Sequence, residues 1–146
     1  MLAVSLVDLG NFFNFSQALE AATRIGAEYA RRGLSCQQSW GSATFASFAS
    51  SGCPAAVQNA VKSSMTFVPA LNTPTVSLSC DCASTANPAT YQPTTCGSSC
   101  VTSPPAGGYT GPNRVFVTVR ASQPFGPMFL LAMPNTLTAV TTIRVQ

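Results

Sequence analysis

The most constraining feature of this chain is its beginning, which reads as one long helix. No proline interrupts Met1–Arg32, and Asp8 is the only charged residue before Glu20. A helix that is apolar all round is buried in protein or in lipid. We therefore expect a helical stalk over residues 1–33, followed by a globular head over residues 34–146.

The second half of the predicted helix is amphipathic. Apolar residues spaced three or four apart share one face, which we expect to cover the head. This stripe consists of Phe15, Ala18, Ala22, Ile25 and Tyr29. Each Glu on a neighbouring face precedes an Arg by four residues, and such pairs stabilise a helix by about 0.2–0.5 kcal/mol each. This ladder, which is either solvated or in contact with a neighbouring subunit, consists of Glu20, Arg24, Glu28 and Arg32.

The apolar first half is too short to cross a bilayer alone, because spanning takes about 20 apolar residues. It also lacks the basic segment and small-residue cleavage site of a signal peptide. We expect the chain to start inside a membrane segment whose first part is missing from this sequence. A buried core helix is the alternative.

Six cysteines, no histidine and few charges favour disulfides and an oxidising compartment. Cys36 and Cys53 flank one segment and are predicted to pair, which contributes about 3 kcal/mol in the chain-entropy model.

The other four cysteines are grouped differently. Cys80 and Cys82 share one face of a predicted strand, and Cys96 and Cys100 are placed to fold back onto it. We expect a nested pairing, Cys80 with Cys100 and Cys82 with Cys96, although three connectivities are possible. A four-thiolate zinc site is the rival, but the C-x-C and C-x-x-x-C spacings fit it poorly.

The head is predicted to be a small antiparallel sheet with one short helix. Pro54 suits a first helical turn and opens a helix over residues 54–65. Apolar and polar residues then alternate with a period of two. The strands predicted from this alternation span about 75–82, 113–122 and 136–146. With the long helix covering the sheet, the fold class is α+β. The packing anchors expected before the short helix are Trp40, Phe45 and Phe48.

Two long connections remain. Residues 83–112 form a loop that is uncommonly long unless it is functional or tied down, which Cys96 and Cys100 would achieve. The connection over 124–134 is expected to plug the core rather than form a contact surface, because large exposed apolar patches are rare on monomers. Its large apolar residues are Phe125, Met128, Phe129, Leu130 and Leu131.

The chemistry of the side chains argues against several functions. The net charge of +3 is spread along the chain, whereas nucleic-acid binding needs a concentrated basic patch. No histidine is present, and no two of the four acidic residues suggest an acid–base pair. No phosphate-binding or nucleophile motif occurs. We expect neither an enzyme, a cofactor nor a metal.

The N-terminal residues resemble a known family. The runs are VDLG (7–10), QAL (17–19) and AATRIGAEYA (21–30). They are similar to the start of TadE-like pilus-assembly proteins, minor pilins or pseudopilins of tight-adherence (Flp) type IV pili. The closing segment from Leu137 to Val145 is a weaker match. Family members carry a leader and a complete membrane helix ahead of the acidic-Gly pair, so the resemblance implies either an N-terminally truncated member or an atypical one.

The resemblance implies a pilin-like fold and a role in priming or capping a pilus. Its implied partners are other pilins, the pilus-assembly machinery and the inner membrane. The implied location is the inner membrane and periplasm, or the pilus at the cell surface. The implied assembly surface consists of Leu2, Leu6, Asp8, Leu9, Phe12, Phe13 and Phe15.

Two other hypotheses remain. One is an exported, disulfide-stabilised binding or adhesion module, in which residues 83–112 and 125–131 hold a ligand such as a surface polymer. The other is a disulfide-rich structural subunit of a different envelope assembly.

Overall fold

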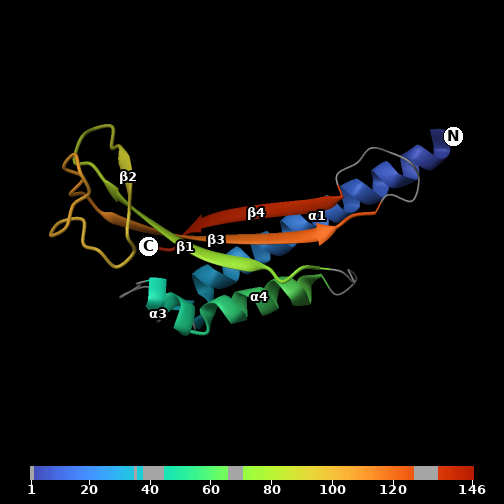
Figure 1. The fold of residues 1–146 in the computed structure, drawn as a ribbon, viewed down its shortest axis with the longest axis horizontal. Coiled ribbons are helices and arrows are strands. Elements are labelled where there is room, and N and C mark those ends of the chain that lie inside the picture. Colours follow the sequence, from blue (N-terminus) through green and yellow to red (C-terminus); the bar gives the residue numbers. More distant parts are fainter. Residues whose placement is uncertain (1, 35, 38–44, 66–70, 127–134) are drawn as a thin grey trace.

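A computed structural model describes residues 2–34, 36–37, 45–65, 71–126 and 135–146, and it has an α+β fold (Figure 1). Its helices are α1 (Leu2–Arg32), α3 (Phe45–Ser50) and α4 (Cys53–Ser64). Its strands are β1 (Thr75–Ala83), β2 (Tyr91–Thr94), β3 (Asn113–Pro124) and β4 (Thr136–Arg144). The expected combination of a long N-terminal helix, a small antiparallel sheet and a short helix is confirmed.

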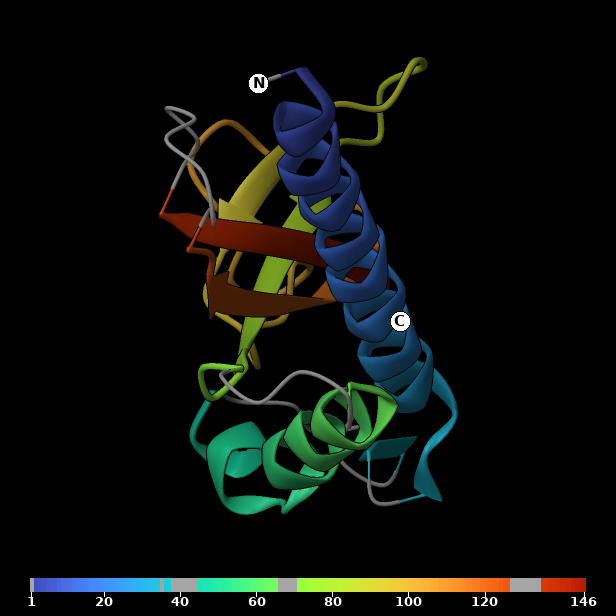
Figure 2. The same ribbon diagram turned by 90° about the vertical axis from the view of Figure 1, so that its right-hand side faces the viewer.

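The strands form one antiparallel sheet in the order β2-β1-β3-β4. Leu78 faces Val117, which faces Ile143 on the next strand, so these side chains project to the same side. That side is buried, and α1 crosses it (Figure 2). The opposite side of β1 carries small exposed polar residues. The sheet therefore has one covered face and one open face.

Strand β2 lies inside the segment that was expected to be a loop over 83–112. It spans only four residues and contains Pro93, which weakens any strand pattern in the sequence. Proline is tolerated here because β2 is an edge strand. The long connection is thus partly folded onto the sheet, beside β1.

The face of α1 that covers the sheet differs from the predicted stripe. Phe15 and Ala18 pack against the core and Ala22 is buried in it, but Ile25 is 49% exposed and Tyr29 is also exposed. Small residues occupy the buried positions instead, because α4 packs closely against α1 there. The buried residues of the second half are Leu19, Ala22, Thr23, Gly26, Ala27 and Ala30.

Gly26 marks the closest approach between α1 and α4. A Cβ atom built there would lie 2.5 Å from Cγ2 of Val61, which is fully buried. One turn earlier, the Thr23 hydroxyl lies 2.9 Å from that of Thr141 and forms a hydrogen bond between α1 and β4. These contacts fix the rotation of α1 about its axis.

Gly26→Ala is therefore expected to destabilise the protein. Overpacking costs about 1–3 kcal/mol, whereas alanine gains only about 1 kcal/mol over glycine in a helix interior. The matched control is Gly10→Ala, because nothing lies within 4 Å of a Cβ atom built at Gly10. Chemical denaturation should show a lower free energy of unfolding for Gly26→Ala and an unchanged or higher one for Gly10→Ala. Equal effects would contradict the close packing.

The charge ladder lies on the solvent side of α1. Glu20 pairs with Arg24 at 3.9 Å and Glu28 with Arg32 at 3.0 Å, and all four side chains are about half exposed or more. Such exposed pairs contribute little to stability.

Three disulfides join the six cysteines in pairs. The predicted pair Cys36–Cys53 is confirmed. The nested pairing is wrong: Cys80 bonds Cys96, and Cys82 bonds Cys100.

The physical reason is the path of the chain after β2. Thr94 lies opposite Cys80 in the register, so Cys96 follows directly beside Cys80. The chain then turns through Gly97, which has a positive φ of 90°. After this reversal the segment runs back along β1, and Cys100 reaches Cys82.

The remaining packing predictions have mixed outcomes. Phe48 is buried, whereas Trp40 and the side chain of Phe45 lie outside the described residues. Phe125 is buried and meets Phe12 and Phe15 edge to face, with ring centroids 5.7 and 6.3 Å apart. It therefore plugs one end of the core, while the predicted plug residues 128–131 lie outside the described part of the chain.

Candidate assembly surface

The first half of α1 exposes a row of large apolar side chains. Leu6 is 66% exposed, Phe13 is 54% exposed, and Leu9 and Val7 are also exposed. Leu6, Leu9 and Phe13 are spaced three and four residues apart, so they lie on one face of the helix. We call these three residues the apolar row. Exposed leucines are ordinary one at a time, but a contiguous row marks a contact surface.

The exposed side chains on this side of α1 change from apolar to charged along the helix. Its apolar row ends at Phe13, and the exposed charges Glu20 and Arg24 follow on this side. Figure 1 shows that the N-terminal end of α1 extends beyond the ends of β3 and β4. The buried face, by contrast, carries no charge from Phe12 to Ala30, and its one buried polar side chain, Thr23, bonds to Thr141 of β4. The change is thus confined to the exposed side, where only an external partner can respond to it.

The predicted assembly surface is too broad. Asp8 is only 1% exposed, and Phe12 and Phe15 pack against the core beside Phe125. Residues 8, 12, 15 and 19 follow one another at spacings of four, three and four, which places Asp8 in phase with buried Leu19. The side chain of Leu2 lies outside the described residues. Of the predicted set, Leu6, Leu9 and Phe13 remain on the exposed side.

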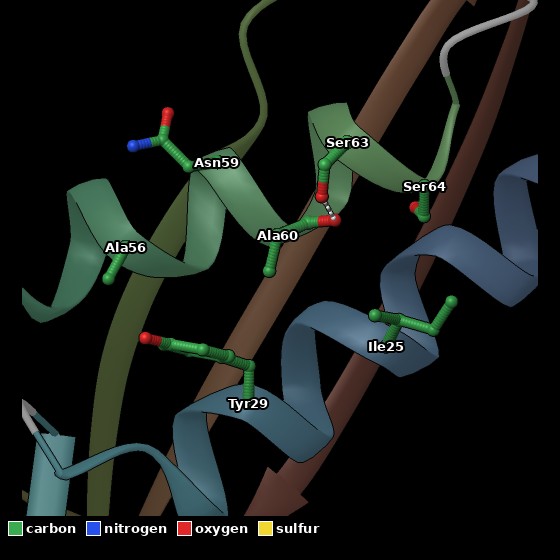
Figure 3. Close-up of a pocket in the computed structure, with 7 residues that line it drawn as sticks. All are labelled: Ile25, Tyr29, Ala56, Asn59, Ala60, Ser63 and Ser64. Carbon is green, nitrogen blue, oxygen red and sulfur yellow. Dashed lines mark hydrogen bonds between the residues drawn. The ribbon is translucent and has the colours of Figure 1, made fainter.

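An open groove runs between α1 and α4 (Figure 3). It has a volume of about 570 Å³, and its lining residues are Ile25, Tyr29, Ala56, Asn59, Ala60, Ser63 and Ser64. Figure 3 shows Ile25 and Tyr29 projecting from α1 towards α4. The hydroxyls of Ser63 and Ser64 donate to backbone carbonyls of their own helix. Apolar and small polar groups therefore line the groove, and its two serine hydroxyls are engaged by their own helix.

The open face of the sheet carries one organised polar cluster. The guanidinium of Arg114 donates two hydrogen bonds to the carboxylate of Asp81, at 2.7 and 2.6 Å. It also lies 3.3 Å from the ring centroid of Tyr91 and 5.1 Å from that of Phe116. The hydrogen bonds to Asp81 raise the pKa of Arg114, so the guanidinium stays charged. The cluster clamps β2 to β3 across β1.

Sequence reasoning missed this cluster because its members are far apart in the chain. Asp81 and Arg114 become neighbours only through the register of β1 and β3, and Tyr91 arrives with the unpredicted strand β2. The one available signal was that Asp81 lies on the polar side of the β1 alternation, where it needs a partner from the next strand.

The described residues contain three disulfides and no cluster that could bind a metal ion. Their cysteines are all held in disulfides, and no group of three His, Cys, Asp or Glu side chains among them could bind a metal ion. The three disulfides fit an oxidising, exported environment. No helix in the described part of the chain is both long enough and apolar enough to span a membrane. Comparisons with protein families, with curated proteins and with solved structures find no match to this chain.

Proposed function

We propose that this protein is a pilin-like assembly subunit, a minor pilin or pseudopilin of a tight-adherence type IV pilus. The observation that carries the proposal is the apolar row Leu6, Leu9 and Phe13 on the outer side of α1. A helix that buries one face in its own head and exposes a second apolar face is built to pack against a neighbour. The partners in this proposal are other pilins, the assembly machinery and the inner membrane.

Two further features support the proposal. The second half of α1 is anchored in the head by Leu19, Ala22 and Ala30, so it holds the apolar first half in a fixed direction. Three disulfides stiffen the head, which suits a part exposed outside the cytoplasm. The proposed location is the inner membrane and periplasm, or the pilus at the cell surface.

Charges placed in the apolar row should abolish assembly. We expect the full chain to self-associate or to bind lipid vesicles, because burial of a large apolar side chain contributes about 1.5–3 kcal/mol. The double variant Leu6→Asp, Phe13→Asp should form no assembly larger than a dimer in analytical ultracentrifugation, and it should not bind vesicles in flotation. Both side chains are exposed, so the variant should keep the thermal stability of the wild type.

The matched control is Val101→Asp, which places a charge on an equally exposed apolar residue of the head. It should behave like the wild type. A wild-type protein that forms no assembly larger than a dimer and does not bind vesicles would refute the proposal, as would equal higher-order assembly by the double variant.

An exported binding module is the second candidate, favoured by the cluster on the open face of the sheet. Tyr91 is half exposed and is held rigidly by Arg114, next to a loop tied by two disulfides. Removing the stalk cannot test this candidate, because Leu19 and Ala22 of α1 belong to the core of the head. The double variant in the apolar row separates the two readings, since a binding module would retain its ligand after loss of assembly.

A further inference from the structure

The two edges of the sheet are protected very differently. Strand β2 forms one edge and is short, contains Pro93 and is followed by the disulfide-bonded Cys96. Strand β4 forms the other edge and spans nine residues without a proline or an acidic residue. Natural proteins protect their edge strands by making them short or by placing proline or charged residues in them, because an open edge pairs with other chains. In β4, Arg144 at the end of the strand is the one charged residue.

The hydrogen-bond pattern identifies which groups of β4 are open. Beyond either end of the strand, Val145 N donates to Val115 O and Phe125 N donates to Asn135 O, both at 2.9 Å. Along one strand of an antiparallel pair, successive residues alternate. One directs its N–H and C=O groups to the partner strand, and the next directs them to the opposite side. Odd-numbered residues of β4 therefore bond to β3, and even-numbered residues direct their N–H and C=O groups away from the sheet. Among the described residues, no segment pairs with this outer side.

The even-numbered side chains of β4 lie on the open face of the sheet, next to this edge, and they are exposed. Val140, in the middle of the strand, is 56% exposed, and the other even-numbered residues of β4 are also exposed. The edge thus combines unpaired backbone groups with β-branched side chains, which favour strand pairing.

We propose that β4 pairs antiparallel with β4 of a second copy of this chain, centred on Val140. This register places Val140 opposite Val140, Thr138 opposite Thr142, and Thr136 opposite Arg144. The pairs that exchange hydrogen bonds in this register are all even-numbered, so each outward N–H and C=O group meets a complementary group. The single charge faces a threonine, so no like charges are opposed. The result is a twofold dimer with one continuous sheet, which carries both α1 helices on one face.

Single cysteines test the register directly in the full chain. In the proposed dimer, the two Cα atoms at position 140 lie about 5.5 Å apart, within the range of a disulfide. Those at position 142 lie four residues apart along the strand, about 13 Å. Val140→Cys should therefore form a covalent dimer under mild oxidation, and Thr142→Cys should not. Cross-linking at neither position, or equally at both, would overturn the proposal.

A backbone variant tests whether the open N–H groups matter. Val140→Pro removes an outward N–H that the sheet itself does not use, and it should raise the dimer dissociation constant at least tenfold in sedimentation equilibrium. Val140→Thr keeps the N–H and should dimerise like the wild type. Folding is checked by circular dichroism. If Val140→Pro folds and still dimerises normally, the edge is not the interface.

The apolar row on α1 offers a separate route to association, so the two must be told apart. The double variant Leu6→Asp, Phe13→Asp should still cross-link through Val140→Cys. Loss of cross-linking in that background would place the contact on α1 and overturn the β4 dimer. The failure of this dimer would leave the proposed pilin function untouched.

Discussion

Leu19→Ala is expected to destabilise the protein by about 2–5 kcal/mol, the usual loss for a fully buried leucine. Leu19 is 1% exposed and belongs to the core between α1 and the sheet. Ile25→Ala, on the same helix, should cost about 1 kcal/mol or less, because roughly half of that side chain remains in water. Urea denaturation monitored by circular dichroism measures both free energies of unfolding.

The comparison decides which face of α1 is buried. A larger loss for Ile25→Ala than for Leu19→Ala would mean that the helix is rotated towards the face expected from its large apolar residues. Leucine and isoleucine differ in helix propensity by well under ~1 kcal/mol, so the difference between the two losses of stability reports mainly on burial.

The rotation of α1 shows why periodicity alone was insufficient. Large apolar side chains drew the prediction towards Ile25 and Tyr29, which lie beside the groove at α4. The true buried series includes Asp8 and Gly26, residues that carry no hydrophobic signal. Gly26 is required because Val61 of another helix leaves no room for a Cβ atom there. A contact between distant elements leaves no local pattern in the sequence.

The strands were predicted where their alternation is long and regular. The pattern from Thr75 and that from Asn113 each mark one buried face, and the structure has strands at both places. Strand β2 has no such pattern and is held by its disulfides and by Tyr91 stacked on Arg114. These contacts join segments that are distant in the sequence. Neither β2 nor the cysteine pairing beside it could therefore be predicted from a local pattern.

For the candidate site, the sequence indicated the apolar start of α1 but not its orientation. Leu6 and Phe12 look equivalent as members of one apolar run, yet Leu6 is exposed and Phe12 packs against the core. The distinction depends on which residues of the helix meet Phe125, a contact between chain positions more than a hundred apart.

The cysteine pairing predicts a large difference in stability between two double Cys→Ser variants. Replacing the bonded pair, Cys82→Ser with Cys100→Ser, removes one disulfide with a sequence separation of 18. The chain-entropy model gives a loss of about 3 kcal/mol for a loop of this size. Replacing Cys80 and Cys100 by serine instead breaks both disulfides that anchor to β1, so the expected loss is about 6 kcal/mol.

Free thiols provide an independent measurement on the same proteins. The first variant should expose no reactive thiol, because Cys80 and Cys96 remain bonded. The second leaves Cys82 and Cys96 without their partners, and both should react with a thiol reagent after denaturation. The nested pairing expects the reverse, with the larger loss in the first variant and the smaller in the second. The order of the two stabilities therefore tests whether the chain reverses at Gly97 and runs back along β1.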